Sequence, residues 1–370
     1  MIRYLLYAML LFVPITLVAE FILHAEPIVV FITSALAIIP LADFIGEATE
    51  ELALRIGPRW GGLLNATLGN AAELIITVFA IREGLLELVR ASITGSILGN
   101  LLLILGLSFF LGGLKNGTQS FDRRTAMTNA TLVFISVIAL LIPSLFDIAI
   151  QDNLAAELGL SEGIAITMIV LYGLSILYGF MQGRAPGDHD PQPEHIGAAD
   201  KRGSAAHSEH EPQWSVAFAV GVLAVATIGI VFMSEALVGA VESVTEAFGL
   251  TEIFIGIIVI PLVGNVAEHL VSVQVALKDK MELRLAVSLG SSLQIALFVA
   301  PVLVFISLLI DSGNPLLLVF NRFELIALIA AAVIASNVAR DGESNWFEGV
   351  MLLSVYIMIG VGFFFIPAGV

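Results

Sequence analysis

The sequence predicts an all-α, polytopic membrane protein with eleven transmembrane helices, arranged as one leading helix followed by two inverted-topology five-helix repeats. The first observation behind this prediction is composition. Of the 370 residues, 58% are hydrophobic and 13% are charged, whereas roughly 25% of a soluble domain is charged. The mean hydropathy of +0.99 agrees. The second observation is a series of apolar runs of membrane-spanning length, and the third is an internal repeat.

Composition also excludes several classes of protein. The chain contains no cysteine, so it has no disulfide framework, thiolate metal site or cysteine nucleophile. The 16 basic residues stand against 32 acidic ones, for a net charge of −16. This balance argues against a nucleic-acid partner and favours a cationic one.

A helix needs roughly 20 apolar residues to cross the hydrocarbon core, and the sequence contains a series of apolar runs of about this length. The first run follows Arg3, as in a signal peptide, but it is too long and lacks a small-residue cleavage pattern, so we expect a retained helix. The second run is short because Asp43 and Glu47 follow closely, and we expect its helix to extend beyond the membrane. The expected spans are residues 3–23, 27–44, 61–81, 91–113, 125–146, 161–182, 214–239, 252–277, 285–310, 317–338 and 346–366.

Basic residues predict the orientation. Of the 16 lysines and arginines, all but Arg82, Arg90 and Arg322 fall in loops on the side of the N-terminus. Because cytoplasmic loops carry the excess of basic residues, the N-terminus is expected in the cytoplasm. An odd number of spans then places the C-terminus on the outer side of the membrane.

The longest polar segment divides the chain. It is rich in acidic residues, proline and glycine, and holds four of the six histidines, so it is expected to be a flexible cytoplasmic linker. A cation-gathering or regulatory loop is the alternative; His207 and His210 have a spacing seen in zinc ligands, but no further ligand is fixed. The expected organisation is a leading helix (1–24), a first repeat (25–183), an acidic, His-rich linker (184–213) and a second repeat (214–370).

The internal repeat is carried by one motif. Gly-Asn-Ala-Ala-Glu-Leu at 69–74 recurs as Gly-Asn-Val-Ala-Glu-His at 264–269, an offset of 195 residues. Further glutamates, glycines and serines match at the same offset, without a gap. Since each repeat has five spans, an odd number, the second copy must enter the membrane from the opposite side. Inverted repeats of this kind are typical of secondary transporters, which bind substrate near the midplane.

The two glutamates of the motif are the central candidate site residues. Glu73 and Glu268 lie about midway along their spans, where a charged side chain costs roughly 2.5 kcal/mol or more. We find no basic residue within these spans that could form a structural ion pair with them. The sequence therefore predicts a functional pair of carboxylates.

The neighbours of the glutamates indicate a site for a hard cation. Gly69 and Gly264 weaken each helix just before the glutamate, which would free carbonyl oxygens to line a cavity. Asn70 and Asn265 add amide oxygens. Such an all-oxygen set suits Ca²⁺, which takes six to eight oxygen ligands, and does not suit a soft metal.

Other polar residues are expected to support proton coupling and cation entry. Ser96 and Ser291 are repeat equivalents on the helices after the motifs, and Gln294 and His269 lie near them. We expect these four, with the two glutamates, to carry or relay protons. The residues expected to attract cations toward the two openings are Glu47, Glu51, Glu242 and Glu246.

These motifs resemble a known family. The segments 69–75 and 264–269, with Ser-Ile-Leu-Gly-Asn-Leu-Leu at 96–102 and Gly-Ser-Ser-Leu-Gln-Ile at 290–295, are similar to the signatures of calcium/cation–proton antiporters, within the calcium:cation antiporter superfamily. The resemblance implies export of cytosolic Ca²⁺ against entering protons, with the signature glutamates as ligands. It implies no enzyme activity and no cofactor, with lipid as the surroundings; the oligomeric state, a homo-oligomer included, stays open.

The charges suggest how such exchange would be enforced. Two carboxylates in one cavity of low dielectric repel each other, so the pair is expected to be neutralised by one divalent cation or by protons. Only loaded forms would then switch between the two faces of the membrane, by sliding of the first helix of each repeat against the signature helices.

Three alternatives differ in their sequence requirements. A sodium–calcium exchanger usually has Ser or Thr near a Pro before the acidic residue, where Ala72 and Ala267 stand here. A cation channel usually places its carboxylates in a symmetric ring, and an intramembrane metal hydrolase would need a His-Glu-x-x-His pattern, which is absent. The choice of cargo among Ca²⁺, Mn²⁺ and Na⁺ stays open.

Overall fold

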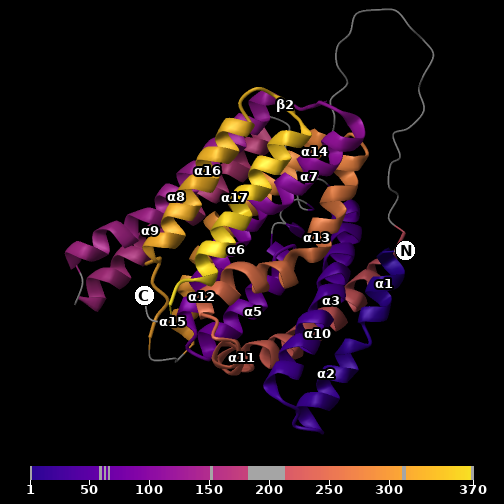
Figure 1. The fold of residues 1–370 in the computed structure, drawn as a ribbon, viewed down its shortest axis with the longest axis vertical. Coiled ribbons are helices and arrows are strands. Elements are labelled where there is room, and N and C mark those ends of the chain that lie inside the picture. The colour runs from indigo at the N-terminus through magenta and orange to yellow at the C-terminus, as the bar shows by residue number, and fades with distance from the viewer. Residues whose placement is uncertain are drawn as a thin grey trace, which may run out of the picture.

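The computed structural model describes residues 2–57, 61, 64–65, 67–150, 153–181, 213–310 and 314–367, and the protein is a bundle of long helices (Figure 1). Short π-helical segments interrupt three of the helices. The helices are α1 (Ile2–Met9), α2 (Phe12–Phe21), α3 (Pro27–Ile56), α5 (Ala71–Arg82), α6 (Leu86–Leu98), α7 (Leu105–Asn116), α8 (Arg123–Ile150), α9 (Leu154–Met181), α10 (Val216–Gly239), α11 (Val241–Phe248), α12 (Glu252–Phe254), α13 (Ile260–Leu277), α14 (Met281–Gln294), α15 (Ala300–Leu309), α16 (Arg322–Val338) and α17 (Trp346–Phe364). The π-helical segments are η1 (Gly99–Ile104), η2 (Ile255–Val259) and η3 (Ile295–Val299), and the strands are β1 (Gln119–Ser120) and β2 (Glu343–Ser344).

The membrane class predicted from the sequence agrees with the helix lengths. In the described part of the chain, eight helices are long and apolar enough to span a bilayer, and a bent pair, Glu252–Val266 with Glu268–Leu277 at 69°, would make a ninth. The expected span 61–81 falls partly outside the described residues. The expected span 317–338 is helical only from Arg322, over 17 residues. The count of eleven stays a prediction.

Helix α3 shows why an apolar run underestimates a helix. It runs for 30 residues, 12 beyond the expected end of its span at 44, and ends at Gly57, whose φ of 86° no other residue type adopts easily. Glutamates are good helix formers, so the helix continues where hydrophobicity stops. The helix therefore continues past its apolar run, and its extension beyond the membrane stays a prediction.

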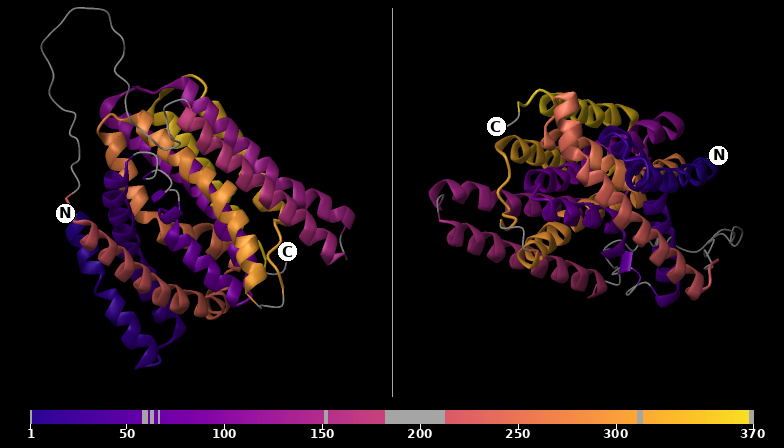
Figure 2. Two further views of the ribbon diagram at one scale, coloured as in Figure 1. Left: turned by 180° about the vertical axis from the view of Figure 1, so that it is seen from behind. Right: turned by 90° about the horizontal axis from the view of Figure 1, so that it is seen from below.

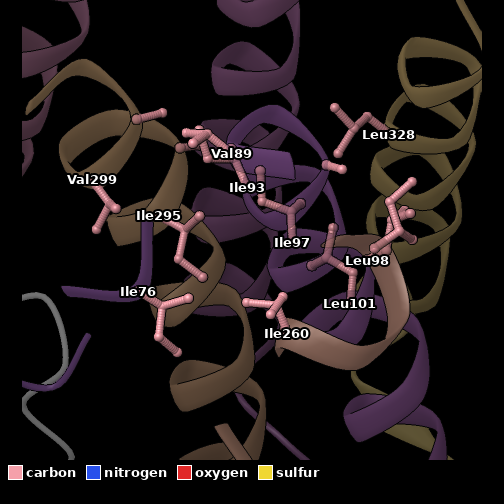
Figure 3. Packing of buried hydrophobic residues seen from close by; sticks show 14 of the residues in the cluster. Ile76, Val89, Ile93, Ile97, Leu98, Leu101, Ile260, Ile295, Val299 and Leu328 are labelled. Atoms are coloured by element: carbon pink, nitrogen blue, oxygen red, sulfur yellow. The ribbon is translucent and has the colours of Figure 1, made fainter. Parts of the chain in front are cut away.

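The core of the bundle is built where elements of the two halves cross at close range. α6 packs against η2: a Cβ added at Gly95 would lie 2.2 Å from the Ile257 carbonyl oxygen, and one at Gly256 would lie 2.5 Å from the Ala91 Cβ. Gly290, the repeat equivalent of Gly95, faces open space instead. Figure 3 shows apolar side chains around this crossing, with labelled residues from α5, α6, η1, α13, η3 and α16.

Helices α3 and α10 form a separate pair that packs along one side of this core (Figures 1 and 2). They are the first helices of the two expected repeats. Their contacts extend to α5 and α13, which carry the two motifs. The structure thus places the pair expected to slide directly against the helices of the candidate site.

A polar cluster ties the first half to the end of α13. β1 and β2 pair antiparallel, with Gln119 opposite Ser344. The Gln119 amide nitrogen donates to the Ala276 carbonyl oxygen at 3.1 Å and to Asp279 Oδ1 at 2.7 Å. Lys115 Nζ donates to the Leu277 carbonyl oxygen at 3.0 Å. A cation at a helix C-terminus is favoured by the helix dipole, so this end of α13 is held firmly.

Candidate cation site

Glu73 lies in the first turn of α5, directly after a turn at Gly69 and Asn70. Its side chain is 3% exposed. Oε1 accepts hydrogen bonds from Ser96 Oγ and, at 2.5 Å, from Asn265 Nδ2, whereas Oε2 is buried without a hydrogen-bond partner. A buried carboxylate oxygen with no donor is costly unless a proton or a cation satisfies it. Glu73 therefore offers one oxygen to such a partner.

Glu268 lies at the bend of the second motif. The chain turns by 69° between Val266 and Glu268. The expected weak point at Gly264 is thus realised two to four residues later, within α13. Ser291 Oγ donates to Glu268 Oε2 at 3.4 Å, and Asn100 Nδ2 donates to Ser291 Oγ at 3.0 Å. This carboxylate is partly exposed and weakly held compared with Glu73.

The same serine–glutamate contact occurs in both halves. Ser96 reaches Glu73 and Ser291 reaches Glu268, and each serine lies 23 residues after its glutamate. In both halves the serine lies near the end of a helix that continues as a π-helical segment, η1 or η3. Such segments are frequent at functional sites. The serines predicted as repeat equivalents are therefore equivalent in their contacts as well.

Asparagines and a glutamine link the two halves across the site. Asn265 of α13 reaches Glu73, and the Asn70 amide nitrogen donates to Gln294 Oε1 at 2.9 Å. Both asparagines donate these hydrogen bonds through their amide nitrogens, so the bonds do not involve the amide oxygens. Asn265 and Gly264, which contact Glu73, lie three and four residues before Glu268 on α13, so the second carboxylate belongs to the same region. The structure therefore gathers Glu73, Glu268 and both asparagines in one cluster.

The glycines of the motifs provide room. A Cβ at Gly264 would lie 3.0 Å from Glu73 Cγ, so the Glu73 side chain packs directly against α13. A Cβ at Gly69 would lie 2.5 Å from the Asn65 carbonyl oxygen within the turn before α5. Whether their carbonyl oxygens bind a cation stays a prediction.

The remaining predicted residues are more scattered. His269 is 8% exposed and its Nε2 is buried without a hydrogen-bond partner. Glu242 and Glu246 are exposed on α11, and Glu47 is half-buried on α3. Glu51, expected at an opening, is instead 8% exposed, and its Oε2 accepts a hydrogen bond from the Trp214 backbone at 3.0 Å. It anchors the start of the second half rather than facing solvent.

Arg284 is the charged residue near the site that sequence reasoning missed. The sequence predicts a loop position for it, just before the span expected at 285–310, but α14 begins at Met281 and the side chain is 1% exposed. It interacts electrostatically with Glu268. The expectation concerned only the two motif spans, and this arginine comes from the neighbouring helix α14. The spacing of Arg284, Ser288 and Ser291, which share one helix face, would have revealed it.

The oxygen atoms available as ligands in this cluster favour a hard cation, bound partly by neutral groups. Among the described residues, no three histidines, aspartates or glutamates are grouped so that they could hold a metal ion. A cation between Glu73 and Glu268 would need amide, hydroxyl or carbonyl oxygens to complete its ligands. Ca²⁺ accepts such mixed oxygen ligands in flexible geometry.

Comparison with known proteins adds four similarities. The family described as sodium/calcium exchanger protein matches residues 26–181 and 218–365. The chain is 44% identical over 370 residues to a Ca(2+)/H(+) antiporter of Aphanothece halophytica, with 98% of this chain and 96% of that protein covered. It is 43% identical over 353 residues to the Ca(2+)/H(+) antiporter ChaA of Bacillus subtilis (strain 168), with 95% and 96% covered. The solved structure of native YfkE is similar with a TM-score of 0.81 and 39% identity, covering 98% of this chain and 100% of that chain.

Proposed function

Because the chain belongs to the sodium/calcium exchanger protein family, we propose that it is a secondary active transporter that exchanges cytosolic Ca²⁺ for protons by alternating access. The observation that carries this proposal is the cluster in which Glu73 and Glu268, one from each half, lie close together with a serine on each. The activity is transport without covalent chemistry. Ca²⁺ is the substrate, and no cofactor is proposed.

The cation would bind between the two carboxylates. Glu73 Oε2, which has no hydrogen-bond partner, is the first ligand. Glu268 and the amide oxygens of Asn70 and Asn265 add to it. The backbone carbonyl oxygens near Gly69 and Gly264 complete the set. Binding of Ca²⁺ to these oxygens requires that protons leave the carboxylates, so the two substrates exclude each other.

Proton coupling follows from that exclusion. A doubly ionised, empty site would be costly to close off from water. The site therefore changes its accessible face when loaded with Ca²⁺ or with protons, which makes exchange obligatory. Ser96 and Ser291 donate hydrogen bonds to the carboxylates and help to hold them in position. Gln294 and His269 are proposed to relay protons to and from the carboxylates.

The topology is part of the same proposal. Eleven helices, one leading helix and two inverted repeats, place the N-terminus in the cytoplasm and the C-terminus outside, with the exposed apolar faces in lipid. Two observations support the repeats: the family matches twice along the chain, and the serine–glutamate spacing is the same in both halves. The proposed boundaries are residues 25–183 and 214–370, joined by the linker at 184–213.

Alternating access would come from α3 and α10. These helices pack on each other and on the motif helices α5 and α13. Sliding of the pair along the core would open the carboxylates to one side and close them to the other. Glu47, Glu242 and Glu246 would attract cations near the ends of the path, while Glu51 holds the start of α10 through Trp214.

The experiment is replacement of each carboxylate by an amide. Glu73→Gln and Glu268→Gln keep the shape of the side chain but cannot hold the charge that a divalent cation needs, so each should reduce Ca²⁺/H⁺ exchange at least about 100-fold in proteoliposomes. Insertion and elution in gel filtration should be unchanged. Glu83→Gln, at the exposed end of α5, is the matched control and should keep normal flux.

Near-normal flux in either Glu73→Gln or Glu268→Gln would contradict the assignment of that carboxylate. A loss of flux in Glu83→Gln equal to that of the two variants would show that the loss has another cause, and would overturn the pair as the site.

A further inference from the structure

Arg284 occupies an unusual place for a charged residue. It lies on α14 where α7 and α13 meet it, and 1% of its surface is exposed. Nε donates to Ser108 Oγ at 2.7 Å and Nη1 donates to Ser272 Oγ, but Nη2 is buried without a partner. A buried cation without a compensating charge is strongly destabilising. An arginine held only by hydroxyl groups therefore requires a carboxylate nearby.

That carboxylate is Glu268. Ser272, which holds the guanidinium, follows Glu268 by four residues on α13, about one turn or 6 Å along the helix. Ser291, which donates to Glu268, shares a face of α14 with Arg284. The electrostatic interaction between Arg284 and Glu268 agrees with this placement, and His269 is the other titratable group close to the guanidinium.

The two halves differ at this point. At the repeat offset of 195 residues, Arg284 corresponds to Val89, which is fully buried among the apolar side chains of Figure 3. Ser272 corresponds to Thr77, whose hydroxyl donates to its own helix backbone, at the Glu73 carbonyl oxygen. In the part of the chain that the structure describes, only the second carboxylate thus has a positive charge beside it.

We propose that Arg284 is a resident counter-charge that competes with Ca²⁺ for Glu268 and thereby limits the affinity of the site for the divalent cation. This inference rests on the proposed function of the Glu73–Glu268 pair. In the arrangement seen here, the guanidinium donates to Ser108 and Ser272, and no hydrogen bond joins it to Glu268 among the contacts of the described residues.

Replacing the arginine and replacing its two serines should have opposite effects on KM. Arg284→Gln removes the charge and keeps a hydrogen-bonding side chain, so KM for Ca²⁺ should fall roughly tenfold, and release should slow, because the competing cation is gone. Ser108→Ala with Ser272→Ala keeps the charge but removes the groups that hold it, so the guanidinium pairs with Glu268 and KM should rise several-fold. Arg284→Lys should stay close to the wild type.

The measurement is initial Ca²⁺ uptake into proteoliposomes at one fixed pH gradient, with KM and kcat separated. Arg340→Gln, an exposed arginine after α16, is the control for loss of one positive charge and should leave KM unchanged. Opposite shifts of KM in the arginine and serine variants support the proposal, since a merely structural role would lower kcat in both and move KM in neither direction.

Active Arg284→Gln protein with an unchanged or higher KM would overturn the proposal, as would serine variants whose KM falls. If Arg284→Gln does not insert, the serine pair carries the same test through its expected rise in KM. A wild-type protein that shows no uptake under a proton gradient would instead overturn the proposed function, so the two failures are distinguishable.

Discussion

At the scale of single residues, the two glutamates are not equivalent. Glu73 accepts two hydrogen bonds and is closed off from solvent, whereas Glu268 accepts one long hydrogen bond, is partly exposed and lies beside Arg284. One donor to Glu73, Asn265, comes from the other half of the chain. A change in the protonation or cation loading of Glu73 therefore affects contacts in both halves. Glu268 is the carboxylate that solvent reaches more easily.

Gly264 gives a prediction about how closely Glu73 must be placed. In Gly264→Ala the added Cβ would lie 3.0 Å from Glu73 Cγ, so the carboxylate must shift by a few tenths of an ångström. Because a misplacement of about 1 Å can cost a factor of 100 in activity, we expect KM for Ca²⁺ to rise roughly tenfold with normal insertion. Uptake kinetics in proteoliposomes would check this.

Gly221→Ala is the control for this prediction, since the position faces open space on α10 and should tolerate a methyl group. A Gly264→Ala protein with wild-type KM and kcat would show that Glu73 does not depend on its contact with α13.

At the scale of elements, the crossing of α6 and η2 holds the two halves together. The helices approach so closely because Gly95 and Gly256 lack side chains there. Small residues are the usual means of close packing between membrane helices. Both glycines matched in the internal repeat, yet only the structure shows that Gly95 is at a contact while its equivalent, Gly290, is not.

These equivalent glycines make a paired prediction about stability. A Cβ at Gly95 would meet the Ile257 carbonyl oxygen at 2.2 Å, and overpacking of this kind typically costs about 1–3 kcal/mol. Gly95→Ala should therefore lower the Tm of the detergent-solubilised protein by several degrees. Gly290→Ala, in open space, should leave the Tm unchanged or slightly raised. Equal shifts in the two variants would refute the role of the crossing.

Helix ends explain most of what sequence reasoning missed. Apolar runs locate the membrane core, but helix α3 continues to Ile56 and α14 begins at Met281, four residues before the expected span. Arg284 lies in that difference, so it was counted as a loop residue. Hydrophobicity ends where charged residues begin, whereas helical hydrogen bonding continues as long as the backbone allows.

At the scale of the whole molecule, the apolar runs predict the membrane class. The repeated motif predicts the family and the candidate carboxylates. Partners across the two halves could not be predicted, since Asn70 with Gln294 and Asn265 with Glu73 depend on how the helices cross. The hydrogen bond from the Trp214 backbone to Glu51 likewise requires that α3 and α10 lie side by side.

The proposed topology can be tested because the natural chain has no cysteine. Single cysteines at exposed positions, Glu83→Cys and Arg340→Cys, should lie on opposite sides of the membrane. In intact cells a membrane-impermeant maleimide should label Glu83→Cys, and it should label Arg340→Cys only after permeabilisation. Labelling of both in intact cells, or the reverse pattern, would contradict the proposed orientation.

The coupling ion distinguishes the proposed function from sodium–calcium exchange. A sodium-coupled exchanger needs further oxygen sites for its smaller charges. Besides Glu73, the buried glutamates in the described part of the chain are Glu51 and Glu324. Glu51 holds Trp214 near the end of α3, and Glu324 caps the start of α16. Neither forms a second carboxylate pair at the candidate site, which favours protons.

The most direct test is Ca²⁺ uptake into proteoliposomes driven either by an acidic interior or by a sodium-loaded interior at matched pH. We expect uptake to follow the proton gradient, to rise as the external pH rises, because protons then compete less with Ca²⁺ for the carboxylates, and to vanish with a protonophore. Uptake driven by the sodium gradient alone, with none under the proton gradient, would contradict Ca²⁺/H⁺ exchange.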